Sequence, residues 1–349
     1  MTTDSVLVDR ARSLADDLLF PQAQVVDRAE RIPDGHLRAL AEAGLFAIAG
    51  PASDGGSALD RSDAWRVGAA LFGGCAATSF VWAQHHGVVR TVAGSSNDGL
   101  RESLLGGMCR GDLLAGVAFA HLRRPGPPPI SATRVEGGWR LDGYSPWTSS
   151  WGAADWFAIA GESPNGELVW AMLPAAGHTG VRADVLDLPV FGATGTVTLT
   201  FDGCVVPDEH VAAIESVTEW READRRQSAV GAPATLGIAE RCIRLIREID
   251  DPLAHETADR LADEHDAGAS RYDELVQATA AGGDMVREAS EHRAHLITLA
   301  QRSATALLAA TGGRGMDLAH PAQRLAREST FFVIQAQTQT GRTATLTSL

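Results

Sequence analysis

The stretch over residues 147–156 carries side chains suited to holding a flat redox cofactor. It reads Trp-Thr-Ser-Ser-Trp-Gly-Ala-Ala-Asp-Trp and lies between two runs with strand character. An indole packs well on an electron-poor ring system such as a flavin, and a neighbouring hydroxyl can hydrogen-bond the edge of that ring. Trp147, Thr148 and Ser149 are therefore candidate flavin contacts. Plain core packing of the aromatic rings is the alternative interpretation of this pattern.

Histidines and cysteines are the other residues that could do chemistry, and their spacing does not suit a metal. Adjacent helical residues such as His85 and His86 point about 100° apart, so packing or capping is their expected role. His121 follows an apolar run and could contact a cofactor or substrate, although a surface or packing role is the expectation. The cysteines show no Cys-x-x-Cys pair and are expected to be buried, reduced thiols: Cys75, Cys109, Cys204 and Cys242.

Composition narrows the class of protein. The 349 residues are enough for two or three domains with sizeable cores. With 44 acidic and 30 basic residues the formal net charge is −14, which argues against nucleic acid or an anionic membrane as the main partner. No run reaches the roughly 18–20 apolar residues of a membrane span, and the N-terminus has no signal-peptide pattern. We expect a cytoplasmic protein.

Helical spacing dominates an N-terminal domain over residues 1–112. Apolar residues recur at helical intervals over 6–19, and a second helix opens at Pro33-Asp34. Longer apolar helices are expected over 62–72 and 76–93, with a glycine-rich loop before the first of them.

The pattern changes to short strands over residues 113–211. A proline-rich turn at 125–129 separates the first apolar run from a hairpin turning at Glu136-Gly137-Gly138. Short strands with turns between them predict a small β-barrel or sandwich. The expected strands are 113–120, 131–135, 139–141, 156–160, 167–173 and 196–201.

Helical patterning returns over residues 212–349 and predicts a C-terminal helical bundle. The expected helices are 225–250, one or two over 270–311, and 321–340. The order of helices, strands and helices predicts an α+β multidomain protein. There is no βαβ alternation and no Gly-x-Gly-x-x-Gly, which excludes a Rossmann fold.

Ordered motifs along the chain resemble those of the acyl-CoA dehydrogenase superfamily. Residues 32–45, followed by Gly50-Pro51, match an early Pro…Leu…Gly-Leu…Pro pattern, and residues 139–143 lead into Trp147-Thr148-Ser149 in the family's order. Residues 201–207 resemble the segment that closes the family's β domain. Near the C-terminus the similar residues are Gly312-Gly313-Arg314-Gly315, Pro321, Arg324, Arg327 and Glu328.

The resemblance implies a flavin, usually FAD, between the β domain and the C-terminal helices. It places Trp147 against the isoalloxazine ring, and Ser149 near the reactive N5 edge with Thr148 beside it. It further implies an acyl-CoA substrate, a homodimer or homotetramer, and these other contacts: backbone groups of Phe119 and Ala120 at the pyrimidine edge, Gly312 and Gly313 where a neighbouring subunit approaches the dinucleotide, and Thr338 at the adenosine.

The chain departs from the family where a dehydrogenase needs its base. Removing the α-proton of an acyl thioester suits a carboxylate, whose pKa burial can raise towards neutrality. Ala336 stands at the position of the family's glutamate, between Gln335 and Gln337, which cannot accept a proton at neutral pH. The earlier helix that carries the base in some members offers only Asp224 or Glu222, and then only with a shifted register. The catalytic base is therefore unassigned.

A second departure concerns the cofactor. The family's Arg-x-x-Phe-Gly-x-Pro loop, whose arginine meets the FAD pyrophosphate, is replaced by residues 248–255, Glu-Ile-Asp-Asp-Pro-Leu-Ala-His. Losing a cation opposite a double phosphate weakens dinucleotide binding. FAD is the first choice, with FMN or a loosely held reduced flavin as alternatives.

Three hypotheses for function follow. The first is a flavin-dependent oxidoreductase acting on the CH–CH bond of an acyl thioester, whose own base is unidentified. In one version of this hypothesis a partner subunit supplies the missing carboxylate. The second is a flavin-dependent monooxygenase of the same fold, which takes reduced flavin from a separate reductase and needs no α-proton base. The third is a non-catalytic subunit that only binds ligand.

Overall fold

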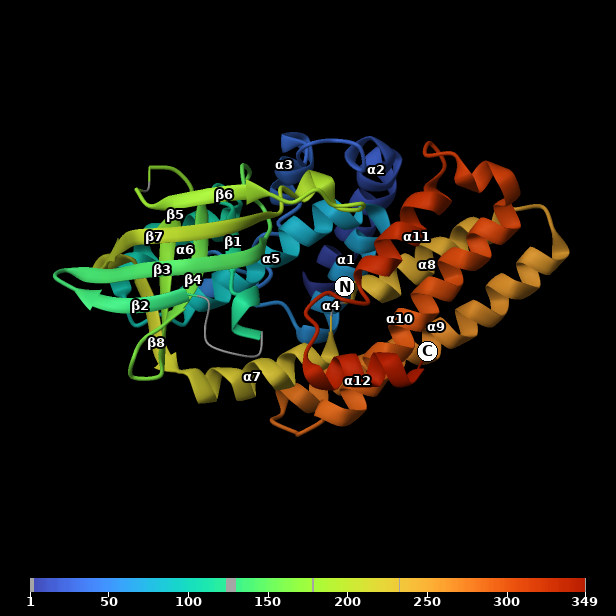
Figure 1. The fold of residues 1–349 in the computed structure, drawn as a ribbon. Coiled ribbons are helices and arrows are strands. Elements are labelled where there is room, and N and C mark those ends of the chain that lie inside the picture. Colours follow the sequence, from blue (N-terminus) through green and yellow to red (C-terminus); the bar gives the residue numbers. More distant parts are fainter. Residues whose placement is uncertain (1–2, 124–129, 178, 232, 349) are drawn as a thin grey trace.

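The protein forms two groups of helices with a β-sheet region beside them (Figure 1). The structure is a computed structural model that describes residues 3–123, 130–177, 179–231 and 233–348. The proline-rich turn expected at 125–129 lies outside the described residues. The observed order of helices, strands and helices confirms the α+β fold class.

The N-terminal helices begin where the sequence supplies caps. The Asp60 carboxylate accepts from the Ser62 N–H ahead of α4, and the Asn97 side chain accepts from the Leu100 N–H ahead of α6. The helix expected over 62–72 is three residues longer than expected, and that over 76–93 has the expected bounds. The helices are α1 (Thr3–Leu14), a π-helical turn (Ala15–Leu19), α2 (Phe20–Val26), α3 (Asp34–Glu42), α4 (Arg61–Gly74), α5 (Ala76–Ala93) and α6 (Asp98–Arg110).

The middle strands form one continuous sheet of eight strands in the order β6-β7-β3-β2-β4-β5-β8, with β1 pairing parallel to β4. The expected hairpin is present: β2 and β3 pair antiparallel from Ile130↔Gly143 to Val135↔Gly138. Strand β3 continues well past residue 141 and reaches the tryptophan-rich stretch. The strands are β1 (Ala115–Ala118), β2 (Ile130–Val135), β3 (Gly138–Thr148), β4 (Trp156–Glu162), β5 (Glu167–Pro174), β6 (Val181–Val185), β7 (Val197–Pro207) and β8 (Val211–Ser216).

The C-terminal helices correct three expected boundaries. The single helix expected over 225–250 is two, because Gly231 has a φ of +77° and Pro233 lacks the N–H that a continuous helix needs. The helix expected to start near 270 starts at Pro252, capped by Asp251. The helix expected over 321–340 stops at Phe331. The helices are α7 (Val217–Val230), α8 (Ala234–Arg247), α9 (Pro252–Ala280), α10 (Val286–Thr311), α11 (Pro321–Phe331) and α12 (Gln339–Ser348).

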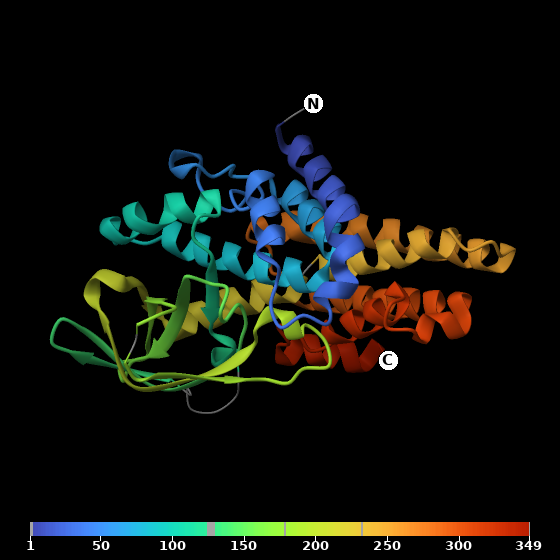
Figure 2. The same ribbon diagram turned by 90° about the horizontal axis from the view of Figure 1, so that it is seen from above.

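Helices α4 and α8 cross at a contact between glycines. A Cβ built on Gly237 would lie 1.9 Å from the Ala69 carbonyl oxygen, and one on Gly73 would lie 2.8 Å from the Gly237 carbonyl oxygen. Only glycine permits backbones to approach this closely. The contact joins the N-terminal helices directly to the C-terminal bundle, and Figure 2 shows the helices of both groups lying alongside one another, with the strands beneath.

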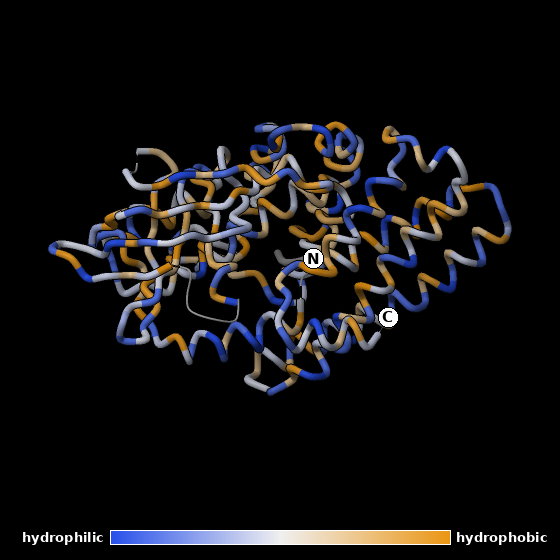
Figure 3. The backbone as a smooth tube through the Cα atoms, in the orientation of Figure 1, coloured by the Kyte–Doolittle hydropathy of each residue, from blue (hydrophilic) through white to orange (hydrophobic). Residues whose placement is uncertain are grey.

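Phenylalanine rings join the three parts of the fold. Phe191, in the loop between β6 and β7, stacks on Phe80 of α5 at 5.7 Å and meets Phe331 at the end of α11 edge-on at 4.5 Å. Phe332 packs on Phe72 of α4 at 5.7 Å. Figure 3 shows hydrophobic residues gathered between elements and a hydrophilic tip where α8 passes into α9. The core therefore continues across all three parts.

Ion pairs of α11 reinforce this junction. Arg327 binds both oxygens of Asp27, at 3.0 and 2.5 Å, and also donates to the Pro189 carbonyl. Arg324, 1% exposed, binds both oxygens of Glu328 within the same helix at 2.8 and 2.7 Å. Arg327 thus holds a carboxylate between C- and N-terminal elements.

His85 links two helices and the sheet. Its Nε2–H donates to the Met108 carbonyl of α6 at 3.1 Å, and its Nδ1 accepts from the Ala115 N–H of β1 at 3.0 Å, which defines a neutral tautomer. Burial lowers its pKa to about 4. The neighbouring His86 packs edge-on against Trp82 at 4.5 Å. The histidine pair therefore has the packing role expected from its spacing.

Three further features of the described residues concern the cysteines, membrane-spanning helices and metal sites. All four cysteines are buried and free, as expected. No helix in these ranges is long and apolar enough to cross a bilayer. Within the same ranges no group of three or more histidine, cysteine or acidic residues is placed to hold a metal ion.

Replacing His85 with glutamine is expected to reduce the loss of stability on acidification. The folded-state pKa is about 4 against an ordinary value of 6.5, so the unfolded chain binds more protons between these values and stability falls as pH falls through that window. The imidazole's share of the loss between about pH 7 and pH 5 is ~2 kcal/mol.

Urea denaturation at both pH values measures this difference, with exposed His255→Gln as the matched control. An equal loss in wild type and His85→Gln would contradict the assignment.

Candidate functional site

The end of β3 and the loop that follows it, together called the tryptophan loop, present an exposed indole beside buried hydroxyls. Trp147 is 46% exposed, whereas Thr148 and Ser149 are buried. Trp147 and Ser150 have φ values of +60° and +74°, which are strained for residues other than glycine. Such strain concentrates at ligand clamps and active sites. The indole is thus outside any sealed interior, and the arrangement of a ring face beside hydroxyls fits a flavin.

A row of hydroxyls ties this loop to the loop between β6 and β7. The Ser149 and Thr196 hydroxyls lie 2.7 Å apart, and Thr196 lies 2.8 Å from the Thr194 hydroxyl. The Thr194 hydroxyl donates to the Phe191 carbonyl at 2.7 Å. Phe191 itself has a φ of +63°. The row therefore runs from the candidate flavin contact to the phenylalanine cluster.

The segment with Phe119 and Ala120 lies against the same end of β3. It leads into a short 3-10 helix, η3 (Ala120–Arg123), whose His121 is buried. His121 contacts the Ser145 hydroxyl through Nδ1 at 3.0 Å and the Ala160 carbonyl through Nε2 at 2.9 Å. The expected surface role of His121 is wrong and its packing role is right, because these contacts fix η3 beside the tryptophan loop.

The loop between α11 and α12 contains the position expected for a base. Ala336 is in the left-handed region, with a φ of +47°. The buried Arg293 guanidinium of α10 donates to the carbonyls of Gln335, Ala336 and Ser228. Burial, and then the charge of Arg123, lowers the pKa of Arg293 to about 10, so it stays protonated at neutral pH. Arg293 thus binds backbone carbonyls of this loop, and the methyl side chain of Ala336 cannot take a proton.

Asp224 is committed to an ion pair. Arg123 donates to its two oxygens at 2.9 and 2.6 Å, and the Ser228 hydroxyl donates to one of them at 3.2 Å. The Arg123 guanidinium also lies 4.7 Å from the centre of the Phe119 ring. Glu222, the other candidate, pairs with Arg225 of its own helix at 2.8 Å. Neither carboxylate is arranged as a base.

The remaining expected contacts lie among the C-terminal elements: Gly312 and Gly313 follow α10, and Thr338 directly precedes α12. Gly312 ends α10, with a φ of +66°, as a helix stop would. The residues from Arg293 to Gly312 rise roughly 28 Å along the helix. A Cβ built on Gly312 or Gly313 meets no atom within 4 Å, so this chain does not crowd them. The Thr338 hydroxyl accepts from the Gly341 N–H at the start of α12.

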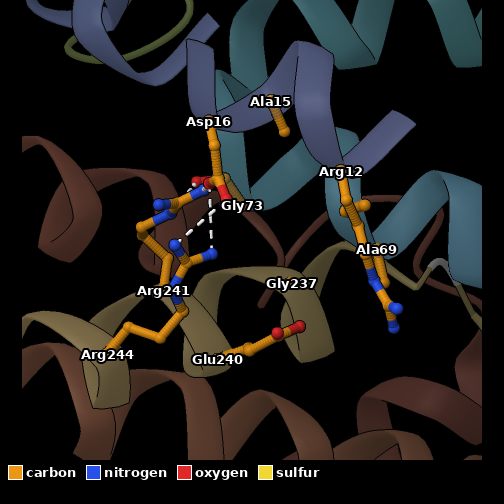
Figure 4. Close-up of a pocket in the computed structure, with 10 residues that line it drawn as sticks. Arg12, Ala15, Asp16, Ala69, Gly73, Gly237, Glu240, Arg241 and Arg244 are labelled. Carbon is orange, nitrogen blue, oxygen red and sulfur yellow. Dashed lines mark hydrogen bonds and ion pairs between the residues drawn. The ribbon is translucent and has the colours of Figure 1, made fainter. Parts of the chain in front are cut away.

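A polar crevice of about 60 Å³ opens where the π-helical turn faces α4 and α8 (Figure 4). Asp16 accepts from both Arg241 and Arg244 there, and Arg241 also donates to the Gly73 carbonyl at 2.8 Å. Ligand pockets for drug-sized molecules measure roughly 300–1,000 Å³. The crevice is too small for a flavin, and its ion pairs fasten α8 to the N-terminal helices.

Sequence reasoning missed the residues that organise the site. Thr194 and Thr196 stand in the run Gly-Ala-Thr-Gly-Thr, where hydroxyls between glycines could have marked a loop rather than a strand start. Arg123 and Arg293 gave no local signal, because their partners lie 101 and 42–65 residues away.

Comparisons with known proteins agree with this geometry. A family model described as the N-terminal domain of acyl-CoA dehydrogenase matches residues 2–112. Benzylmalonyl-CoA dehydrogenase of Aromatoleum aromaticum is 28% identical over 214 residues, covering 58% of this chain and 55% of that protein. A short-chain specific acyl-CoA dehydrogenase, mitochondrial, of Sus scrofa is 25% identical over 220 residues, covering 60% of this chain and 52% of that protein. The alignments span about half the length of these relatives.

A solved structure extends the likeness over the whole fold. A glutaryl-CoA dehydrogenase from Mycobacterium smegmatis in complex with FADH2 superposes with a TM-score of 0.86 at 14% identity, covering 100% of this chain and 94% of that one. Helical, β and helical parts in this order define the fold class of that enzyme. Residues 2–112 therefore match the acyl-CoA dehydrogenase family model, and the whole chain shares the fold of the solved glutaryl-CoA dehydrogenase.

A double-mutant cycle on Arg123→Gln and Asp224→Asn is expected to show strong coupling. Each single variant leaves a largely buried charge without its partner and should cost about 2–3 kcal/mol, whereas the double variant should recover about 1–2 kcal/mol of the summed loss. Chemical denaturation measures all four proteins.

The exposed pair Glu222 and Arg226, 3.8 Å apart, is the control and should couple by less than about 0.5 kcal/mol. Additive effects at Arg123 and Asp224 would instead mean that the carboxylate is available for other chemistry.

Proposed function

We propose that this chain is a flavin-dependent oxidoreductase acting on the CH–CH bond of an acyl thioester, with the α-proton base supplied by a partner subunit. The observation that carries the proposal is the absence of an available carboxylate at both expected positions: Ala336 has a methyl group and Asp224 is held by Arg123. The relatives, one named benzylmalonyl-CoA dehydrogenase and the other short-chain specific acyl-CoA dehydrogenase, support the substrate class.

The residues present fit a flavin, and we propose FAD, with FMN as the alternative. Trp147 offers the ring face, Thr148 and Ser149 the edge, and Phe119 and Ala120 the backbone beside η3. Gly312 and Gly313 are proposed to lie where a neighbouring subunit approaches the dinucleotide, in a homodimer, a homotetramer or a heteromer. Thr338 is proposed to contact the adenosine part. When bound, the flavin supplies a hydride acceptor.

The chain's own residues are proposed to orient the reactants and keep water out. The phenylalanine cluster, in which Phe191 packs on Phe331, is proposed to close one side of the site. Arg293, which binds the Ala336 carbonyl, is proposed to fix the loop over which substrate would lie. Because position 336 is alanine and both Asp224 and Glu222 are engaged by arginines, the proton would leave to a group outside the chain.

A flavin-dependent monooxygenase is the second candidate. Such an enzyme receives reduced flavin from a separate reductase and needs no α-proton base, so the engaged Asp224 is no obstacle. A non-catalytic ligand-binding subunit is the third. Purification, flavin identification and anaerobic titration with acyl-CoA distinguish the three: bleaching without oxygen supports dehydrogenation, product formed only with oxygen and a reductase supports oxygenation, and absence of flavin supports the third.

Installing a carboxylate with Ala336→Glu is expected to give the isolated chain dehydrogenase activity. General-base catalysis contributes about 10²–10⁴-fold, so anaerobic bleaching by acyl-CoA should be at least about 100-fold faster than in wild type. Stopped-flow absorbance of the bound flavin measures the rate.

Gln337→Glu adds the same charge one residue away and serves as the control. Rapid bleaching by the wild-type chain alone would refute the need for an external base.

A further inference from the structure

The hydroxyls of Ser149, Thr196 and Thr194 form a row between the two strained loops. They can donate their protons in only one direction along this row. Each of its three oxygen–oxygen contacts, 2.7 to 2.8 Å long, needs one proton. The Phe191 carbonyl can only accept, so Thr194 gives its proton there. Thr194 must then accept from Thr196, and Thr196 must accept from Ser149.

This direction fixes what Ser149 can offer to a ligand. Its only hydroxyl proton is used by Thr196, so the group presents lone pairs. Ser149, Thr194 and Thr196 are 2–6% exposed, which leaves bulk water little access to the row. If the Ser149 hydroxyl turned its proton towards a ligand, its buried hydrogen bond to Thr196 would be lost. In a low-dielectric interior such a bond is costly to leave unmade.

The direction is set by packing far from Ser149. The Phe191 carbonyl stands at the end of the row because that residue is left-handed, and its ring is held by Phe80, Phe331 and Phe332. The Thr194 N–H also donates to this carbonyl, at 3.0 Å. The acceptor that orients the row thus depends on α5 and on the end of α11.

We infer that Ser149 serves only as a hydrogen-bond acceptor and that the site therefore holds reduced flavin more tightly than oxidised flavin. The N5 atom of reduced flavin carries a hydrogen that Ser149 can accept, whereas N5 of oxidised flavin is itself an acceptor. The inference rests on the proposed placement of Ser149 at the N5 edge.

One gained or lost hydrogen bond predicts a preference of about tenfold. For a two-electron couple that ratio raises the reduction potential of the bound flavin by about 30 mV.

The test measures anaerobic binding of oxidised and dithionite-reduced FAD and FMN, together with the potential of the bound flavin. Wild type is expected to prefer the reduced form about tenfold. Thr194→Val keeps the hydroxyls at 149 and 196 but removes the fixed donor, so the row can reverse and the preference should disappear.

Thr194→Ser keeps the donor and should retain the preference. Thr198→Val, in β7 two residues after Thr196 and outside the row, is the matched control and should behave as wild type.

Each result decides a different question. If neither FAD nor FMN binds in either state, the proposed function and this inference both fail. If flavin binds but wild type shows no preference, or Thr194→Val keeps it, the inference fails and the flavin proposal stands. Should Thr194→Val not fold, Ser149→Ala should weaken reduced flavin only, and equal weakening of both forms would overturn the inference.

Discussion

The packing of Phe191 against phenylalanines from two other parts of the chain is the contact on which the site depends. A bulky residue in the left-handed region is costly and persists only where its surroundings determine it. Here the ring is fixed by Phe80 and Phe331, and the backbone strain is retained because releasing it would remove the ring from the core. The same residue supplies the carbonyl that ends the hydroxyl row, so hydrophobic packing sets the polarity of a buried hydrogen-bond chain.

Guanidinium groups lie at both positions expected for a catalytic base: Arg293 binds the loop that carries Ala336, and Arg123 pairs with Asp224. Arg123 and Arg293 bring two guanidinium groups close enough for one to lower the pKa of the other, and Asp224 is the carboxylate that pairs with Arg123. Arg293 also meets the last turn of α7 through the Ser228 carbonyl, where a cation is favoured by the helix dipole. These guanidinium groups therefore hold a loop and a helix end in place, a structural use of a region that in a dehydrogenase must pass a proton.

Sequence alone predicted what depends on local pattern. The helix Ala76–Ala93 follows from its continuous apolar run, and the β2–β3 hairpin follows from alternation around a glycine turn. The predicted helix boundaries were wrong where a single backbone angle ends a helix, as at Gly231. The residues on both sides of Gly231 are helical, so the sequence pattern gave no sign of the break. For the site, Trp147 and Ser149 were found by residue type and remain proposals as flavin contacts. Thr194, Thr196 and Arg293 were not found, because their partners are brought close only by tertiary folding.

The glycine crossing of α4 and α8 limits how this chain can diverge. With backbone oxygens within 1.9 and 2.8 Å of the positions a methyl group would occupy, either glycine can change only if the two helices separate. Separation would also draw Arg241 away from the Gly73 carbonyl it binds at 2.8 Å. Drift in sequence is therefore expected to spare Gly73 and Gly237 while surrounding positions vary, so the spacing of these two glycines is a signature by which distant members with the same helix contact can be recognised.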